Sequence, residues 1–147
     1  MNVIDALALA RELHAGQVDK AGEPYIWHPV RVMVRLPVGA SQDAKIVALL
    51  HDVIEDCGAT VGSLIERKVP SRIARGVLAV SRQAGEPYRD FIRSIASLGG
   101  VAAQVKLADI EDNLDAARMN VLTALDPLKA ASLRQKYRDA LNILTEL

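Results

Sequence analysis

The segment AKIVALLHDVIED, residues 44–56, constrains the fold most, because an apolar helical stripe runs straight into a group of ionisable side chains. These side chains are His51, Asp52, Glu55 and Asp56. At about 100° per residue, a continuous helix would present all four within an arc of about 140°. Burying such charged groups is costly unless they are paired or bound to a metal. The segment therefore predicts a buried central helix that carries a metal site.

The composition favours a single all-α domain spanning residues 1–147. Half of the residues are hydrophobic but only 3% are aromatic, so the core is mainly aliphatic or alanine. Eighteen basic residues balance eighteen acidic residues, and no overall field attracts nucleic acid or an anionic membrane. We therefore expect a small-molecule partner rather than a nucleic acid or a membrane.

The single cysteine, Cys57, excludes an intrachain disulfide and suits a reducing compartment. The N-terminus lacks the basic-then-apolar pattern of a signal peptide, and no apolar run approaches the roughly 20 residues of a membrane span. We expect a cytoplasmic protein. The sequence leaves a homodimer open, although no apolar stripe is clearly surplus to the core.

Apolar residues at steps of three and four predict about seven to eight helices and no strand. The expected helical ranges are 2–15, 29–36, 41–56, 61–68, 70–83, 87–97, 101–122 and 127 to the end. Residues 16–28 are expected to form a loop, with His28 at the entrance of the helix that Pro29 begins. We expect Trp27, the only tryptophan, to pack in the core.

Four side chains on three expected helical elements are able to bind a divalent cation from apolar surroundings. They are His28, His51, Asp52 and Asp109. Two imidazoles and two carboxylates suit Mn²⁺, Fe²⁺ or Zn²⁺. The alternative is a buried salt-bridge network in a helical bundle, which is destabilising by several kcal/mol when its charges are left unpaired. The set therefore favours a metal site.

Three blocks of the sequence resemble the signature blocks of the HD-domain hydrolases of the RelA/SpoT type. These blocks are HAGQVDKAGEPYIWHPV (14–30), ALLHDVIED (48–56) and VKLADIEDN (105–113). Within that group, the chain is similar to the stand-alone small alarmone hydrolases, including the metazoan SpoT homologues. The resemblance covers roughly residues 1–120. It implies a helical HD fold and a Mn²⁺-dependent hydrolysis that removes the 3′-pyrophosphate of ppGpp or pppGpp.

The resemblance also implies a role for each matching residue. His28, His51, Asp52 and Asp109 match the family's metal ligands. Glu55 and Asp56 match its acidic pair, which activates and orients the attacking water. Asn113 matches an active-site asparagine near the substrate sugar and phosphates, and Lys20 matches a basic residue in the substrate-binding loop.

Two departures from the family pattern concern substrate recognition. Asp19 stands where the family usually has an arginine that helps to hold the guanine base, and a carboxylate cannot stack as a guanidinium does. Leu114 and Asp115 follow Asn113 where the family usually has Met-Arg, so that basic contact is either missing or moved to Arg118. A hydrolase of another nucleotide or small phosphoester, and a non-catalytic nucleotide-binding module, therefore remain alternatives.

Overall fold

The computed structural model describes residues 1–146, and over these residues the fold is all-α, as predicted. Leu147, the last residue of the expected domain span, lies outside the described residues. The helices are α1 (Val3–Leu13), α2 (Trp27–Val34), α3 (Gln42–Leu50), α4 (Val53–Cys57), α5 (Val61–Glu66), α6 (Ser71–Ala79), α7 (Tyr88–Leu98), α8 (Gly100–Asn113), α9 (Ala116–Leu125) and α10 (Pro127–Thr145). Residues 1–146 form no strand, and Val18 and Pro24 make an isolated bridge within the α1–α2 loop.

The structure breaks the helix expected over 41–56 into α3 and α4, with a turn at His51 and Asp52. The His51 side chain explains the break. Its Nδ1 atom lies 2.6 Å from the carbonyl oxygen of Ala48, whereas its backbone N–H reaches the same oxygen only at 3.5 Å. The imidazole therefore competes with the backbone for this acceptor and ends the helix.

The helix expected over 101–122 is also broken in two, at the junction of α8 and α9. Asp115 is the N-cap of α9, with its side chain accepting hydrogen bonds from the backbone N–H groups of Ala117 and Arg118. The non-helical backbone conformation of Asp115, with φ −52° and ψ 124°, begins a new helix instead of continuing the old one. The two breaks account for the helices beyond the seven to eight expected.

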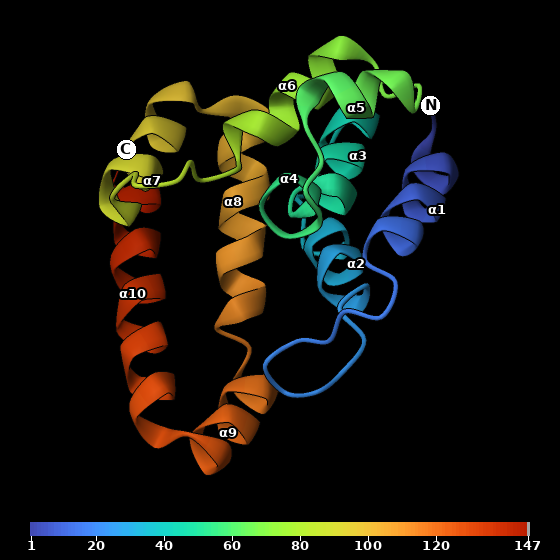
Figure 1. Ribbon diagram of the computed structural model, residues 1–147. Helices are drawn as coiled ribbons and strands as arrows, with labels where there is room; N and C mark the ends of the chain where they lie inside the picture. The colour runs from blue at the N-terminus through green and yellow to red at the C-terminus, as the bar shows by residue number, and fades with distance from the viewer. Residues whose placement is uncertain (147) are drawn as a thin grey trace.

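Helix α8 connects the two main parts of the core. It packs against α2 and α3 on one side and against α7 and α10 on the other, and Figure 1 shows it standing between these groups. The larger apolar cluster is built mainly from α1, α2, α3 and α6, and the smaller one from α7, α8 and α10. Helix α9 joins α8 to α10 at one end (Figure 1). Side chains on α8 can therefore reach both halves of the molecule.

The expected core position of Trp27 is wrong. Its side chain is 53% exposed at the first turn of α2, while the adjacent His28 and Pro29 are buried. Since successive helical residues point about 100° apart, burying His28 turns Trp27 outward.

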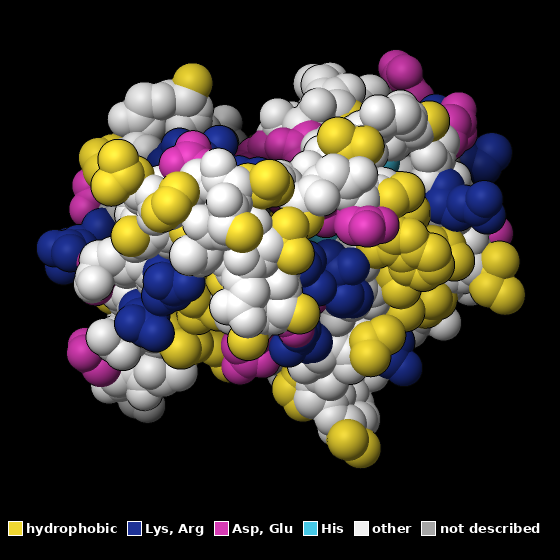
Figure 2. Space-filling model, turned by 90° about the horizontal axis from the view of Figure 1, so that it is seen from below, with side chains coloured by type: hydrophobic (Ala, Val, Ile, Leu, Met, Phe, Trp, Pro, Cys, Tyr) yellow, Lys and Arg dark blue, Asp and Glu magenta, His cyan; other side chains and the backbone are white. Residues whose placement is uncertain are grey.

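Charges of both signs are interspersed over the face shown in Figure 2, as the zero net charge leads one to expect. Within residues 1–146, no helix combines the length and the apolar character needed to span a membrane.

Candidate metal centre and active site

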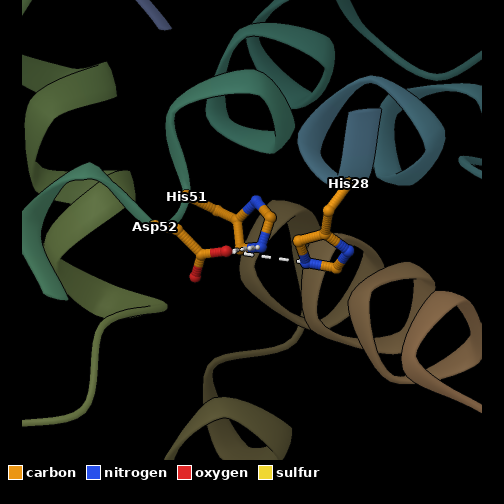
Figure 3. Close-up of side chains that lie close together, drawn as sticks. All are labelled: His28, His51 and Asp52. Atoms are coloured by element: carbon orange, nitrogen blue, oxygen red, sulfur yellow. Dashed lines mark ion pairs between the residues drawn. The ribbon is translucent and has the colours of Figure 1, made fainter. Parts of the chain in front are cut away.

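Three helical elements bring the four expected metal ligands together. His28 comes from the first turn of α2, His51 and Asp52 from the turn between α3 and α4, and Asp109 from α8. Ligand atoms of His28, His51 and Asp52 all lie within 4.8 Å of one another (Figure 3). Asp109 Oδ1 joins them, at 2.9 Å from His28 Nε2 and 3.5 Å from His51 Nε2. The predicted convergence of these four residues is present in the structure.

Hydrogen bonds on the far side of each imidazole turn both Nε2 atoms toward the centre of the cluster. Nδ1 of His51 donates to the Ala48 carbonyl, and Nδ1 of His28 donates to the Asp112 carboxylate at 2.8 Å. Such outer partners fix the tautomer and the ring orientation of metal-binding histidines. Each ring is therefore held with Nε2 available as a ligand atom.

The donor set fits a divalent cation. His51 Nε2 is fully buried and faces carboxylate oxygens of Asp52 at 3.0 Å and Asp109 at 3.5 Å, which only a protonated ring can pair with directly. The lone pair of a neutral imidazole and the lone pairs of carboxylates do not satisfy one another, whereas a cation between them satisfies both. Two imidazole nitrogens and two carboxylates are typical ligands of a borderline transition-metal ion.

The ionisation of the cluster is consistent with cation binding. Burial alone would raise the pKa of Asp52 and Asp109, but His51 and His28 hold the pKa of Asp52 below its usual range, and Lys106 and the same histidines do so for Asp109. Burial alone would lower the pKa of the two rings, yet hydrogen bonds to Asp109 and Asp112 raise that of His28, and the charges of Asp52 and Asp109 raise that of His51. The two carboxylates therefore stay ionised, and their negative charge attracts protons or a metal ion to the imidazoles.

Neighbouring polar groups hold the two carboxylates in place. The Tyr25 hydroxyl donates to Asp52 Oδ2. Lys106 Nζ lies 2.9 Å from Asp109 Oδ2, and Asn113 Nδ2 donates to Asp109 Oδ1 at 3.0 Å. Tyr25 and Lys106 were not expected to take part. The sequence held one clue to each residue. Lys106 lies three residues before Asp109 on the same helix, which makes the two side chains neighbours. Tyr25 lies three residues before His28 in the adjoining loop.

Asp112 is the most important residue that the sequence did not identify as functional. Its side chain has no exposed surface, and besides His28 it contacts three arginines. These are Arg31 at 3.0 Å, Arg35 at 3.1 Å and Arg118 at 2.7 Å. Although burial opposes ionisation, the hydrogen bonds to His28 and Arg31 lower the pKa of Asp112 to about 2. Asp112 is therefore an ionised group that orients His28.

The acidic pair lies on α4, directly after the turn that carries His51 and Asp52. Glu55 accepts a hydrogen bond from the backbone N–H of Arg82, and Asp56 accepts one from Gln17 Nε2 at 3.1 Å. Partial burial raises the pKa of Glu55. Both carboxylates line the same cavity as Asp52, so they face the space next to the metal ligands.

The cavity has a volume of about 470 Å³, which lies within the range of small-molecule sites. Lys20 and Asn113, the two expected substrate-binding residues, also line it, and His51 is fully buried beneath. Helices α7, α9 and α10 contribute Phe91, Met119, Leu122 and Leu133 to the apolar part of its wall, and the α1–α2 loop contributes Val18 and Ala21. A cavity lined by both charged and apolar side chains suits a ligand that carries both phosphate and a ring system.

Both departures from the family pattern have structural roles in this chain. Asp19 Oδ1 accepts hydrogen bonds from the backbone N–H groups of Ala21 and Glu23, each at 2.9 Å, and so forms the turn of the α1–α2 loop. Asp115 caps α9. Arg118 lines the cavity, but its guanidinium donates to the side chain and the carbonyl of Asp112. A basic group is therefore present near the expected position, but it is already paired.

The fold and the site define an all-helical domain built around a buried His/Asp cluster suited to a divalent cation. The model of the HD domain family matches residues 6–88. The chain belongs to this family.

Curated relatives extend the match beyond residue 88. The guanosine-3′,5′-bis(diphosphate) 3′-pyrophosphohydrolase of Aquifex aeolicus is 34% identical over 117 residues, covering 74% of this chain and 17% of the relative. The bifunctional (p)ppGpp synthase/hydrolase SpoT of Escherichia coli is 32% identical over 145 residues, covering 97% of this chain and 20% of the relative. The chain thus spans about a fifth or less of the length of these relatives.

A solved structure shows the same fold. It belongs to a metazoan ortholog of SpoT, described as hydrolysing ppGpp and as playing a role in starvation responses. The TM-score is 0.69 at 24% identity, and the match covers 98% of this chain and 92% of that protein. The helical HD arrangement is therefore shared over nearly the whole chain.

Proposed function

We propose that this chain acts as a single domain that hydrolyses the 3′-pyrophosphate of ppGpp or pppGpp in a metal-dependent reaction. The observation that carries the proposal is the convergence of four metal-binding side chains beside a cavity that Glu55 and Asp56 also line. The names of the curated relatives supply the substrate, since several are guanosine-3′,5′-bis(diphosphate) 3′-pyrophosphohydrolases.

The proposed metal ligands are His28, His51, Asp52 and Asp109, and the proposed ion is Mn²⁺. The mixed nitrogen and oxygen donor set supports a borderline divalent ion of this kind. When bound, the ion would supply Lewis acidity by offsetting negative charge on the phosphoryl oxygens and lowering the pKa of a coordinated water.

Glu55 is the proposed general base. Its raised pKa brings it closer to neutrality than that of an ordinary carboxylate, which favours proton transfer from the attacking water. The backbone N–H of Arg82 fixes the carboxylate while leaving further lone pairs available. Asp56, held by Gln17, would orient the water, and the 3′ phosphoester bond would break to release pyrophosphate.

Asn113 and Lys20 are the proposed substrate contacts. Asn113 lies against Asp109 and lines the cavity, where its amide can reach the sugar or a phosphate. Lys20 places a positive charge on the loop side, where burial and Lys129 lower its pKa.

A second candidate is the same hydrolysis on another nucleotide or small phosphoester. It is favoured by the carboxylates of Asp19 and Asp115, which form a turn and a helix cap at the two positions where the family usually offers basic substrate contacts. A non-catalytic nucleotide-binding module has no need of an acidic pair beside its metal ligands.

One assay separates these functions. The purified Mn²⁺-loaded protein is incubated with ppGpp, pppGpp and a panel of other nucleoside phosphates, and the products are resolved by chromatography. Release of pyrophosphate from ppGpp or pppGpp alone supports the proposal. Turnover confined to other phosphoesters supports the second candidate, and binding without turnover of any compound contradicts both hydrolase functions.

A further inference from the structure

The basic side chains that line the cavity fall into two groups. Arg31 and Arg118 are paired with Asp112, and Lys106 is paired with Asp109. The other lining cations are Lys20, Arg82 and Lys136, and none of them has an ion-pair partner within the described part of the chain. The second group therefore brings three cations that form no ion pair within residues 1–146 to a cavity that Glu55 and Asp56 also line.

Two of these cations meet at a single aromatic ring. Lys136 Nζ on α10 lies 4.2 Å from the centre of the Tyr88 ring, and Arg82 Cζ, in the α6–α7 connection, lies 5.7 Å from the same centre. Tyr88 itself begins α7. Lys136 also lies 5.6 Å from the ring centre of Tyr137. Residues more than 50 positions apart in the sequence thus form one compact cationic and aromatic cluster on the cavity wall.

Placing Lys136 close to other positive charges is electrostatically unfavourable in the absence of a bound anion. Burial, together with the positive charges of Arg82, Lys20 and Lys106, lowers the pKa of Lys136. Among the neighbours that act on Lys136, Glu55 opposes this effect, but the two residues form no ion pair. Cation–π contacts with the tyrosine rings offset the repulsion between these positive charges only in part. A bound anion would relieve the repulsion.

We infer that Arg82 and Lys136, placed around the Tyr88 ring, form an anion subsite that takes a second phosphoryl group of the substrate, beyond the one that faces the metal ligands. The inference rests on the proposed function in one respect, since that substrate carries two diphosphates. The subsite would take a diphosphate, either the outgoing pyrophosphate or the diphosphate at the 5′ position. Arginine and lysine together offer several charged donors to such a group.

Binding of inorganic pyrophosphate and of GDP to the Mn²⁺-loaded protein tests the subsite without requiring turnover. Titration calorimetry compares the wild type with Lys136→Gln and Arg82→Gln. Losing one charge-assisted contact should weaken binding about ten- to a hundredfold. Arg138→Gln is the matched control, because it removes an exposed cation of the same helix that lies outside the cavity and has no ion-pair partner among residues 1–146. It should bind as the wild type does.

The two ligands distinguish the two sources of the diphosphate. Weaker binding of pyrophosphate alone assigns the subsite to the leaving group, and weaker binding of GDP alone assigns it to the 5′-diphosphate. Weaker binding of both supports a subsite that accepts either. Recovery in Lys136→Arg, with unchanged thermal unfolding of all variants, attributes the effect to charge.

Wild-type affinity of both Gln variants for both ligands would overturn the subsite, even if ppGpp is hydrolysed. Lys136-dependent binding of either ligand without any ppGpp turnover would support the subsite while contradicting the proposed function. The two proposals can therefore fail separately.

Discussion

His28 Nδ1 lies 2.8 Å from Oδ2 of Asp112, a carboxylate with no exposed surface. The opposite nitrogen of the same ring lies 2.9 Å from Asp109 Oδ1. One imidazole thus connects the His/Asp cluster on its inner side to a group of arginines on its outer side. Carboxylate–histidine pairs of this kind orient metal ligands and increase their basicity.

Replacing Asp112 by Asn should weaken metal binding about 10- to 100-fold, since the outer partner of His28 loses its charge. The three arginines around Asp112 would also lose a buried counter-ion, so the free energy of unfolding should fall by about 3–5 kcal/mol. Metal titration and denaturant unfolding measure the two effects. Glu111→Gln, an exposed carboxylate on the same helix, is the control. Wild-type metal affinity in Asp112→Asn would remove Asp112 from the positioning of His28.

Asp52→Ala should abolish bound metal and activity together. Asp52 Oδ2 is 3.0 Å from His51 and 3.5 Å from His28, so its loss removes the carboxylate shared by both rings. Elemental analysis of the purified variant measures the metal. Asp43→Ala, which removes a surface carboxylate paired with Arg72, should keep both metal and activity. Full turnover by a metal-free Asp52→Ala protein would end the metal proposal.

Glu55→Gln should keep the metal and lose most turnover. Glutamine preserves an oxygen for the backbone N–H of Arg82 but cannot accept a proton from water. A general base typically contributes about 10²- to 10⁴-fold, so kcat should fall by that factor while metal content stays unchanged. Steady-state kinetics with elemental analysis checks both expectations. Unchanged kcat would mean that another group takes the proton.

Most of the helices, and the identity of the four side chains that converge at the His/Asp cluster, were predictable because each depends on local patterns. Apolar spacing marks the helices, and the three sequence blocks place His28, His51, Asp52 and Asp109 in order. The prediction of one continuous helix over 41–56 was wrong. The spacing of apolar residues does not reveal that the His51 imidazole forms a hydrogen bond with the Ala48 carbonyl and ends the helix. The residues after the turn nevertheless face the same cavity.

The supporting residues were not predictable, because they depend on contacts between distant segments. Asp112 meets His28 across 84 positions, and Lys136 reaches Tyr88 only after α9 turns the chain back. An isolated Asp or Lys on a helix looks the same in the sequence whether it is exposed or paired in a cavity. The prediction that Trp27 packs in the core was wrong because it relied on residue type alone. Tryptophan is often found in cores, but here the burial of its neighbour His28 turns Trp27 outward.

Stabilisation of the protein by Mn²⁺ should increase from about pH 6 to about pH 8. The raised pKa values of His28 and His51 mean that the metal-free protein holds protons on these rings, which the ion must displace. In the metal-free protein, the stability that these rings contribute is complete below their unfolded pKa of about 6.5 and is lost as pH rises through the folded values. Thermal unfolding with and without Mn²⁺ measures the difference. A shift independent of pH would contradict proton displacement.

Replacing Asp19 by Arg, the residue usual in the family, should raise the KM for ppGpp rather than lower it. Asp19 holds the backbone N–H groups of Ala21 and Glu23, and an arginine cannot accept these hydrogen bonds. Losing two such bonds should destabilise the loop by ~1–3 kcal/mol, and this loop carries Lys20 and Tyr25 into the cavity. Hydrogen exchange of the two amides should accelerate.

Asp19→Asn is the matched control, because its amide oxygen can accept the same two hydrogen bonds and keep the turn. It should retain the wild-type KM and slow exchange at both amides. A lower KM in Asp19→Arg, with exchange still slow, would mean that the loop keeps its shape without the carboxylate and that a guanidinium there binds the base. The Asp19 departure would then reflect a different substrate rather than a requirement of the turn.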